Sequence, residues 1–318
     1  MDRSGPVAQL RAVVAAFARA HLGDDTHWCV GLSGGADSLA LTAVAARLRP
    51  TTALIVDHGL QAGSADVAKR ASEQAAALGC VDAQILPVDV GTVGGPEAAA
   101  RTARYGALQT ARHGAPVLLG HTLDDQAETV LLGLGRGSGA RSLAGMRAHD
   151  PPWCRPLLGI RRETTVAACA ALGLAPWQDP HNSDPRFTRV RLRNEVLPLL
   201  EQVLGGGVAE ALARTAAALR EDTEALDAAA AAVGLPAEAL PIENLDGLSA
   251  AVRRRVIRAW LLDGGACDLT DAQIRSVDAL VTDWRGQGGV AVPGGLSRER
   301  LFAGRRNGTL VLYRQPVA

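Results

Sequence analysis

The sequence predicts an α/β protein built on a parallel sheet, followed by a second and smaller α+β domain. From residue 7 to residue 133, short apolar runs alternate with stretches of helical periodicity. Each run is apolar throughout rather than at every second position, which is typical of strands buried on both faces between helices. We expect a first domain at 1–204, a linker and long helix at 205–233, and a small domain at 234–318.

The first domain alternates between strand and helix. After a helix at 7–22, strands are expected at 28–32, 53–56, 84–88 and 116–120, each followed by a helix, at 37–48, 64–78, 96–112 and 124–133. Pro87 cannot donate a ladder hydrogen bond, so the third strand is expected to be bent or at an edge. Ligands of parallel sheets bind at the carboxyl ends of the strands, so we expect the chemistry there.

The later segments are less regular. Residues 134–160 are rich in Gly, Arg and Pro, and helices are expected at 163–172 and 189–200. Three glycines at 205–207 indicate a linker before a long helix at 208–232. The small domain is expected to contain helices at 249–262 and 270–281 and strands near 289–292, 296–302 and 309–313.

Composition excludes several classes of protein. The 33 basic residues balance 33 acidic ones, so net charge does not decide whether nucleic acid binds. Lys69 is the only lysine, which nearly excludes a catalytic lysine. Five cysteines without a C-x-x-C pair argue against a disulfide scaffold, a zinc ribbon or an iron–sulfur cluster. Without a signal-peptide run or eighteen consecutive apolar residues, we expect a cytoplasmic protein with no membrane partner.

A glycine-rich loop lies between the first expected strand, which contains Gly31, and the helix after it. The loop reads Ser33, Gly34, Gly35, Ala36, Asp37, Ser38. Two glycines and a helix N-terminus let backbone N–H groups surround a phosphate, and the serines add hydroxyl donors. Asp37 would repel phosphate directly, so we expect it to hold Mg²⁺. The alternative is a capped turn without a ligand. The loop lacks the lysine of the common nucleotide loop and resembles that of the PP-loop ATP-pyrophosphatases, which cleave ATP between the α and β phosphates.

Further motifs narrow the resemblance. They are Val56-Asp-His-Gly-Leu60, Glu97-Ala-Ala-Ala-Arg-Thr-Ala-Arg104-Tyr105, Gly120-His-Thr-Leu-Asp-Asp-Gln-Ala-Glu128, Arg136-Gly-Ser-Gly139, Gly145-Met146, Arg155-Pro-Leu-Leu158 and Trp177-Gln-Asp-Pro-His-Asn182. Over residues 25–200 the chain resembles the tRNA(Ile)-lysidine synthase family. This implies a PP-loop fold of the adenine nucleotide α-hydrolase type, with ATP, Mg²⁺, free L-lysine and a tRNA(Ile) with a CAU anticodon as ligands. The implied reaction adenylates the wobble cytidine, and the lysine ε-amine then displaces AMP.

The resemblance and the residue chemistry suggest roles for single side chains. Asp125 and Glu128 lie three residues apart, so they share a helix face and suit a cation or the proton of the attacking amine. The alternative is an acidic helix N-terminus. Arg101 and Arg104 also share a helix face, and one or both are expected to offset charge on the reacting phosphate or on the RNA backbone. The resemblance favours Arg104, and the alternative is a solvated helix face. Four residues at strand ends are expected to line the nucleotide pocket: Asp57, His58, Gly120 and His121.

An excess of arginine suggests where RNA binds. Residues 134–193 contain ten arginines and four acidic residues, and the expected phosphate contacts are Arg136, Arg189, Arg191 and Arg193. The family usually carries Asn where Val190 stands, and the alternative is a salt-bridged helix surface. In the small domain, Arg253 and Arg254 are expected to contact tRNA. Longer family members add another C-terminal domain for which this sequence shows no counterpart.

Three rival functions remain open. A tRNA thiolase of the same superfamily typically uses C-x-x-C cysteines, which this sequence lacks. A small-molecule synthetase acting on NAD or GMP precursors does not explain the Leu123-Asp-Asp-x-x-Glu128 pattern and the basic segment. A non-catalytic nucleotide or RNA-binding protein does not need the intact carboxylates. A homodimer is compatible with the sequence.

Overall fold

The computed structural model describes residues 5–23, 26–59, 63–91, 95–137, 139–180, 184–234, 239–294 and 299–316. The chain packs into two compact units. Unit 1 contains Met1–Leu132 and Gly145–Thr215, and unit 2 contains Gly133–Ala144 and Ala216–Ala318. The division at 204, 233 and 234 stays a prediction.

Unit 1 is built on a six-stranded sheet in the order β3-β2-β1-β4-β6-β5. The strands are β1 (Trp28–Gly31), β2 (Thr51–Asp57), β3 (Asp82–Pro87), β4 (Val117–Leu119), β5 (His149–Asp150) and β6 (Trp153–Cys154). All neighbours are parallel except β5 and β6. The predicted parallel fold is confirmed, and β3 lies at an edge as Pro87 indicated. The short strands β5 and β6 fall in the segment expected to be irregular.

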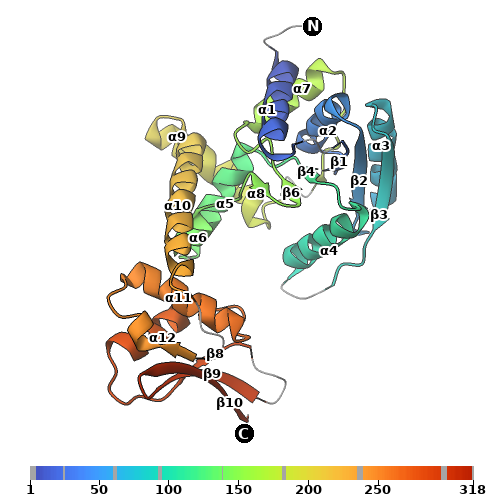
Figure 1. Ribbon diagram of the computed structural model, residues 1–318. Helices are drawn as coiled ribbons and strands as arrows, with labels where there is room; N and C mark the ends of the chain where they lie inside the picture. The colour runs from blue at the N-terminus through green and yellow to red at the C-terminus, as the bar shows by residue number, and fades with distance from the viewer. Residues whose placement is uncertain are drawn as a thin grey trace. The chain divides into compact units, whose positions relative to one another are not determined.

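Helices cover both faces of this sheet (Figure 1). They are α1 (Pro6–His21), α2 (Ala36–Leu48), α3 (Ser64–Ala77), α4 (Pro96–Ala111) and α7 (Arg162–Ala171). Between β4 and β5, the chain also forms α5 (Leu123–Gly135) and the short α6 (Gly139–Leu143), which belongs to unit 2. One core cluster joins one face of the sheet to α1, α2, α3 and α7, and a second joins the other face to α4. Burial on both faces explains why these strands are apolar at every position.

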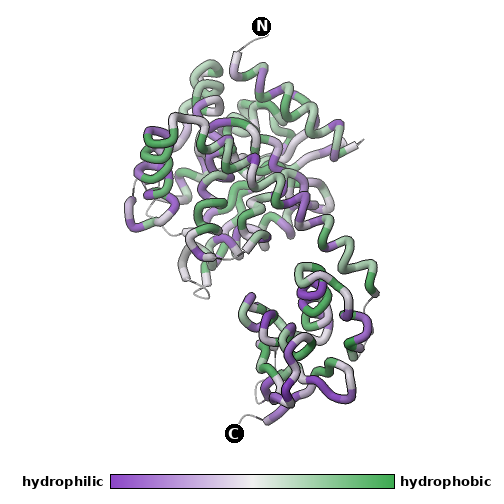
Figure 2. The backbone as a smooth tube through the Cα atoms, turned by 90° about the vertical axis from the view of Figure 1, so that its left-hand side faces the viewer, coloured by the Kyte–Doolittle hydropathy of each residue, from purple (hydrophilic) through white to green (hydrophobic). Residues whose placement is uncertain are grey.

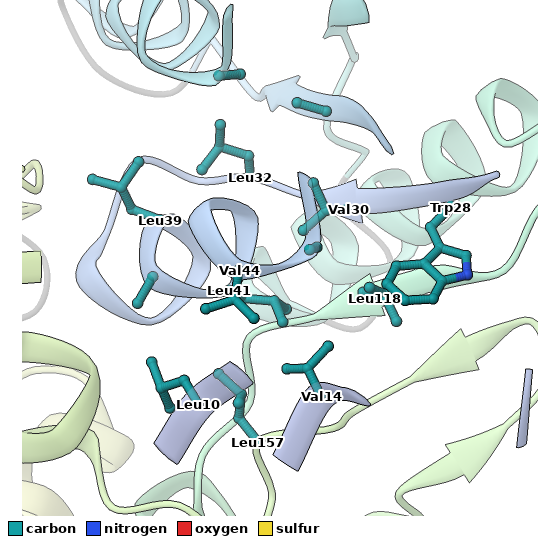
Figure 3. Packing of buried hydrophobic residues seen from close by; sticks show 14 of the residues in the cluster. Leu10, Val14, Trp28, Val30, Leu32, Leu39, Leu41, Val44, Leu118 and Leu157 are labelled. Atoms are coloured by element: carbon teal, nitrogen blue, oxygen red, sulfur yellow. The ribbon is translucent and has the colours of Figure 1, made fainter. Parts of the chain in front are cut away.

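The main core lies directly behind the glycine-rich loop. Leu32 precedes the loop and Leu39 follows it, and both are fully buried among α1, α2 and the sheet (Figure 3). Burying each such leucine contributes about 1.5–3 kcal/mol. The loop is therefore anchored by apolar packing at both ends. Along the helices, hydrophobic and hydrophilic stretches alternate, because each has one face in the core (Figure 2).

The helix expected at 189–200 is interrupted. It consists of α8 (Thr188–Arg191), a π-helical turn η2 (Leu192–Val196) and α9 (Leu197–Leu204), and then comes α10 (Val208–Ala231). A π turn inserts one extra residue per turn and redirects the side chains that follow it. Within the described residues, no single helix is long and apolar enough to cross a membrane. The helical segments Thr188–Leu204 and Val208–Ala231 reach the necessary length and hydropathy only when taken together, and they are bent by 95° relative to each other.

Unit 2 carries a separate antiparallel sheet in the order β7-β10-β9-β8. Its elements are β7 (Ala239–Pro241), η3 (Ile242–Asn244), α11 (Ala250–Asp263), α12 (Asp271–Thr282), β8 (Val290–Val292), β9 (Glu299–Arg306) and β10 (Thr309–Pro316). Thr270 and Gln273 form a capping box that starts α12. The expected α+β character is confirmed, and β7 is an additional strand.

Candidate active site

The glycine-rich loop joins β1 to the N-terminus of α2. Ser33 N–H donates to Ser38 Oγ at 3.2 Å, the two serine hydroxyls lie 3.1 Å apart, and Ser38 Oγ donates to Gly35 O at 3.0 Å. Gly34 has φ +81°, a conformation that favours glycine. Gly35 is the N-cap of α2, and glycine has no side chain that could accept a hydrogen bond from the helix. The first N–H groups of α2, at Ala36, Asp37 and Ser38, are therefore not capped by the Gly35 side chain. The loop has the geometry of an anion site.

The ends of β1 and β4 crowd against this loop. A Cβ on Gly120 would lie 2.9 Å from both Asp37 C and Ser38 N, which are backbone atoms. A Cβ on Gly31 would lie 3.0 Å from Leu119 Cδ2. Gly31 therefore leaves room for the Leu119 side chain, and Gly120 allows backbone of β4 and of the loop to pack closely. Gly120 sets how near β4 can approach the start of α2.

Asp37 lies in the first turn of α2 and is tied to α7. Arg162 Nε donates to Asp37 Oδ2 at 2.9 Å, and the buried Thr165 hydroxyl donates to Oδ1. Burial raises the pKa of Asp37, although Arg162 and Thr165 work to lower it. Burial thus disfavours the ionised form of Asp37, and a bound cation would favour that form.

Asp125 has two separate partners at the start of α5. Its Oδ2 accepts from the Thr122 N–H and hydroxyl, both at 2.8 Å, which caps the helix. Its Oδ1 accepts from Arg162 Nη2 at 2.6 Å. Burial works to raise the pKa of Asp125, but the Arg162 charge and the Thr122 hydrogen bonds outweigh it, and the pKa is lowered. Asp125 is therefore both a helix cap and an ionised member of the cluster.

Glu128 is fully buried one turn further along α5. Its Oε1 accepts from Arg193 Nε at 2.7 Å, while Arg162 lies 3.7 Å away. Its Oε2 has no hydrogen-bond partner among the described residues, although Arg189 Nη1 stands 3.7 Å away. Burial raises the pKa of Glu128, opposed by Arg193. A buried carboxylate oxygen without a hydrogen bond is costly, so a ligand donor would satisfy it.

The two outer arginines of the Arg189, Arg191, Arg193 run therefore join the carboxylate cluster. Arg193 also lies 3.6 Å from Asp125 Oδ1. Arg191 between them is exposed and pairs with Glu195 on its own helix. The π turn starts at Leu192, between Arg191 and Arg193. Of the predicted RNA contacts in this run, the structure thus places two against Glu128 and one on the surface.

A second group of polar side chains lies at the ends of β2 and β4. Arg104 on α4 is close enough to His58 and His121 for its charge to depress both of their pKa values. Burial is the larger cause for both histidines, and it brings the pKa of His121 to about 4. Burial also lowers the pKa of Arg104. The Nδ1 atoms of both histidines are buried and lack a partner among the described residues.

These neutral imidazoles suit hydrogen bonding to a nucleotide better than ion pairing with phosphate. Asp57, at the end of β2, accepts from the Gly59 N–H at 3.0 Å, which shapes the turn that carries His58. The four residues expected to line a nucleotide pocket thus lie at the carboxyl ends of β2 and β4.

The remaining predicted RNA contacts lie in unit 2. Arg136 is exposed just after α5. Arg253 Nε donates to Asp278 Oδ1 at 2.6 Å, and Arg254 Nε donates to Oδ2 at 2.8 Å. Asp278 is buried, so these two arginines hold α11 against α12. Their contact with tRNA stays a prediction.

Two residues of the site escaped the sequence reading. They are Arg162, which the sequence shows only as one of ten arginines in a basic segment, and Thr165. Their signal was their spacing: they lie three residues apart at the start of the expected helix 163–172, so they share a face. Which loop that face meets depends on tertiary packing of α7 on α2, which periodicity does not report.

The carboxylates of the site fit Mg²⁺ only in combination with a nucleotide. No group of three or more His, Cys, Asp or Glu side chains within the described ranges is arranged to hold a metal ion. Mg²⁺ bound with a nucleotide usually takes one or two carboxylates, the rest of its ligands being phosphate oxygens and water. Asp37 beside the loop fits that arrangement, whereas a metal held by protein alone does not fit.

Comparison with known proteins identifies both units. A PP-loop domain model matches residues 8–200, and a TilS substrate binding domain model matches residues 240–311. A tRNA(Ile)-lysidine synthase of Mycolicibacterium paratuberculosis is 70% identical, and one of Mycobacterium leprae is 65% identical, each over the full length of both chains. The U34-tRNA thiolase NcsA of Methanococcus maripaludis, solved with its [4Fe-4S] cluster, is 19% identical with a TM-score of 0.56. That match covers 68% of this chain and 80% of the thiolase. It supports the fold alone.

Proposed function

This chain belongs to the tRNA(Ile)-lysidine synthase family, and from that membership we infer how its site performs the family's reaction. The chain ligates L-lysine to C2 of the wobble cytidine in the CAU anticodon of tRNA(Ile), with conversion of ATP to AMP and pyrophosphate. The C2 carbonyl oxygen attacks the α-phosphorus and pyrophosphate leaves. The lysine ε-nitrogen then attacks C2, AMP leaves with the former carbonyl oxygen, and the nitrogen loses its protons.

The first step uses the loop and the polar group at the strand ends. N–H groups of Gly34 to Ser38 surround the polyphosphate, and the α2 dipole favours its charge. Arg104 offsets charge at the α-phosphorus, since a cation there stabilises the transition state. His58 and His121 hydrogen-bond the nucleotide through their Nδ1 atoms. Bound Mg²⁺, held at Asp37 and by the phosphates, would neutralise the pyrophosphate that leaves.

The second step uses the carboxylates of α5. The lysine ammonium must lose a proton before its nitrogen can attack. Glu128 suits this proton transfer, because its Oε2 accepts no hydrogen bond from the described part of the chain and burial raises its pKa. Asp125 stays ionised and attracts the ammonium. Arg162 positions both Asp37 and Asp125, so it links the nucleotide to the lysine side of the site.

One observation carries this assignment: a fully buried glutamate lies beside the arginine that binds the phosphate-loop aspartate, and one of its oxygens has no hydrogen bond from any described residue. The test supplies ATP, Mg²⁺, labelled lysine and a CAU-anticodon tRNA to the purified protein. Label in RNA, with stoichiometric AMP and pyrophosphate, supports the proposal. Pyrophosphate release without lysine incorporation would indicate a different nucleophile, and omission of Mg²⁺ measures the metal requirement.

A tRNA thiolase activity is not favoured. Cys169 is the cysteine beside the loop, where its Sγ lies 3.4 Å from Ala36 O. Burial, reinforced by Asp37, raises the pKa of this thiol to about 11, so it is protonated at neutral pH. We further propose a cytoplasmic location and a homodimer, with Arg136 and Arg191 contacting tRNA phosphates. Light scattering of the purified chain decides the oligomeric state, and Arg136→Gln and Arg191→Gln decide the contacts through the salt dependence of tRNA binding.

A further inference from the structure

The four-stranded sheet of unit 2 has one covered face and one open face. Helices α11 and α12 lie on the same side of the sheet (Figure 1). There Leu301, Ala303 and Leu310 are buried in a cluster with residues of both helices. Side chains alternate between the two faces of a strand, so the neighbouring positions point the other way. Within the described part of unit 2, the core cluster contains none of these alternate strand positions.

The open face has an unusual composition. Its described positions, by alternation, are Ala239, Pro241, Ala291, Arg300, Phe302, Gly304, Arg306, Thr309, Val311, Tyr313 and Gln315. Among these described positions there are two exposed arginines and no acidic residue, in a chain whose basic and acidic residues are equal in number. The face is therefore complementary to a polyanion.

Two aromatic rings form the centre of this face. Phe302 and Tyr313 are a cross-strand pair, with ring centroids 5.6 Å apart and an interplanar angle of 14°. The Arg306 guanidinium carbon lies 4.8 Å from the centroid of the Tyr313 ring. The rings and the guanidinium together form a stacking surface of the kind that binds bases.

Glycines make room for this surface. A Cβ on Gly304 would lie 3.0 Å from Tyr313 Cε1, and one on Gly289 would clash with the Tyr313 hydroxyl. The Tyr313 ring therefore lies across two neighbouring glycines instead of standing among larger side chains. This placement keeps the Tyr313 ring close to the backbone at both glycines.

We propose that this face binds unpaired nucleotides of the tRNA outside the anticodon loop, with bases stacking on Phe302 and Tyr313 and phosphates contacting Arg300 and Arg306. The proposal rests on the proposed function, which makes a tRNA the substrate. Unpaired nucleotides fit better than a duplex, because only unpaired bases expose a ring face for stacking. A protein surface fits less well, since it would have to supply acidic groups to both arginines.

The test compares two double variants of the full chain, Phe302→Leu with Tyr313→Leu, and Arg300→Gln with Arg306→Gln. Leucine keeps apolar area but removes the ring face. Binding of labelled full-length tRNA is expected to weaken at least about tenfold in the aromatic variant. In the arginine variant, the slope of log affinity against log salt is expected to fall by about 1–2. Each variant raises KM for full-length tRNA and leaves kcat unchanged.

Two controls separate this proposal from the proposed function and from misfolding. Lysine ligation to an anticodon stem–loop RNA is expected to be unchanged in both variants, because that substrate lacks the distant nucleotides. Arg275→Gln, an exposed arginine of α12 paired with Asp271, is expected to leave tRNA binding unchanged. Unchanged full-length tRNA binding in both double variants overturns the proposal, as does a loss of self-association without a loss of tRNA affinity. Failure of the wild type on both RNAs overturns the proposed function instead.

Discussion

The Nε atom of Arg162 donates a 2.9 Å hydrogen bond to Asp37 Oδ2, although 125 residues separate them in the sequence. Through another nitrogen, the same guanidinium reaches Asp125 at 2.6 Å. A planar guanidinium fork fixes the separation of two carboxylates, which an ammonium group cannot do. One side chain from α7 therefore sets the spacing between the phosphate loop and the first turn of α5.

Replacing Arg162 tests this coupling. Arg162→Gln is expected to lower kcat for lysine ligation by about 100-fold, because a displacement of about 1 Å in a catalytic group has that effect. Arg162→Lys is expected to recover only part of the loss, since it restores the charge but not the fork. Steady-state kinetics with lysine and tRNA measures both. The control is Arg161→Gln, whose partners are Asp124 and Glu210 at the edge of the site. Wild-type activity in the lysine variant would argue against a geometric role, because a charge without the fork would then be sufficient.

Removing the charge of Asp37 is expected to separate stability from activity. Burial raises the pKa of this carboxyl in the folded state. The stability that this group contributes is complete below its unfolded pKa of about 3.9 and is lost as the pH rises through the raised folded value. At pH 7.5, the Tm of Asp37→Asn should therefore equal or exceed that of the wild type, and the difference in Tm between the two proteins should shrink toward pH 4. Ligation should be abolished in this variant, because Asp37 is the proposed Mg²⁺ ligand.

Thermal unfolding across this pH range provides the measurement. The control is Asp271→Asn, which also removes a carboxylate from a first helical turn, but at a side chain that is 70% exposed. It should change stability by about 0.5 kcal/mol or less and leave ligation intact. A lower Tm for Asp37→Asn at pH 7.5 would show that the ion pair with Arg162 outweighs the cost of burial.

The pH dependence of ligation is expected to follow Glu128. Its pKa is raised by burial, so the acid limb of kcat/KM for lysine should lie above the ordinary glutamate value of about 4.3. Arg193 lowers this pKa, so Arg193→Gln should move the acid limb to higher pH. Arg191→Gln, at an exposed pair with Glu195, should leave the limb in place. A shift of the limb to lower pH in Arg193→Gln would exclude Glu128 as the group that must be ionised.

Local sequence was sufficient for the scaffold of the site. Continuous apolar runs predicted parallel strands, and Pro87 indicated the edge of the sheet, because both signals depend only on a residue and its near neighbours. The phosphate loop was recognisable because its glycines, serines and aspartate are contiguous. Spacing on one helix was enough to place Asp125 and Glu128 together.

The partners of those carboxylates were not predictable in the same way. Arg162 reaches Asp37 only because α7 packs on α2, and Arg193 reaches Glu128 only where a π turn interrupts the helix expected at 189–200. Charge counting assigned both arginines to one basic RNA surface, whereas their side chains pair with carboxylates. Arg253 and Arg254 illustrate the same limit, since Asp278 follows them by some twenty-five residues on another helix. Long-range ion pairs leave no periodic signal in the chain.

Crowding at the end of β4 gives a steric prediction. In Gly120→Ala, the new Cβ would lie 2.9 Å from backbone atoms of Asp37 and Ser38, so the loop must move. Overpacking of this kind costs about 1–3 kcal/mol, and ATP affinity should fall as well because the loop amides are displaced.

The control is Gly106→Ala, where a Cβ on α4 meets nothing within 4 Å. It should be neutral or stabilising by about 0.5–1 kcal/mol. Urea unfolding and nucleotide titration measure the two effects, and wild-type behaviour of Gly120→Ala would contradict the close approach.

The arginines of α11 provide the last prediction, because their structural and RNA-binding roles have different signatures. The Asp278 side chain is only 4% exposed and is paired with both Arg253 and Arg254. Removing one member of a buried pair leaves an uncompensated charge and costs about 3–5 kcal/mol. Arg253→Met is expected to approach that loss, since its side chain is 14% exposed and also donates to Leu248 O. Arg254→Met, at 31% exposure, should lose less.

Replacing the whole group distinguishes the two roles. The triple variant Arg253→Met, Arg254→Met, Asp278→Leu removes all charges together, and apolar replacements of a buried ionic group are often neutral or stabilising. If the arginines act only in the fold, this variant should recover stability in urea unfolding and bind tRNA with an unchanged salt slope. A slope lowered by about 1–2 in a stably folded triple variant would instead assign them to tRNA phosphates.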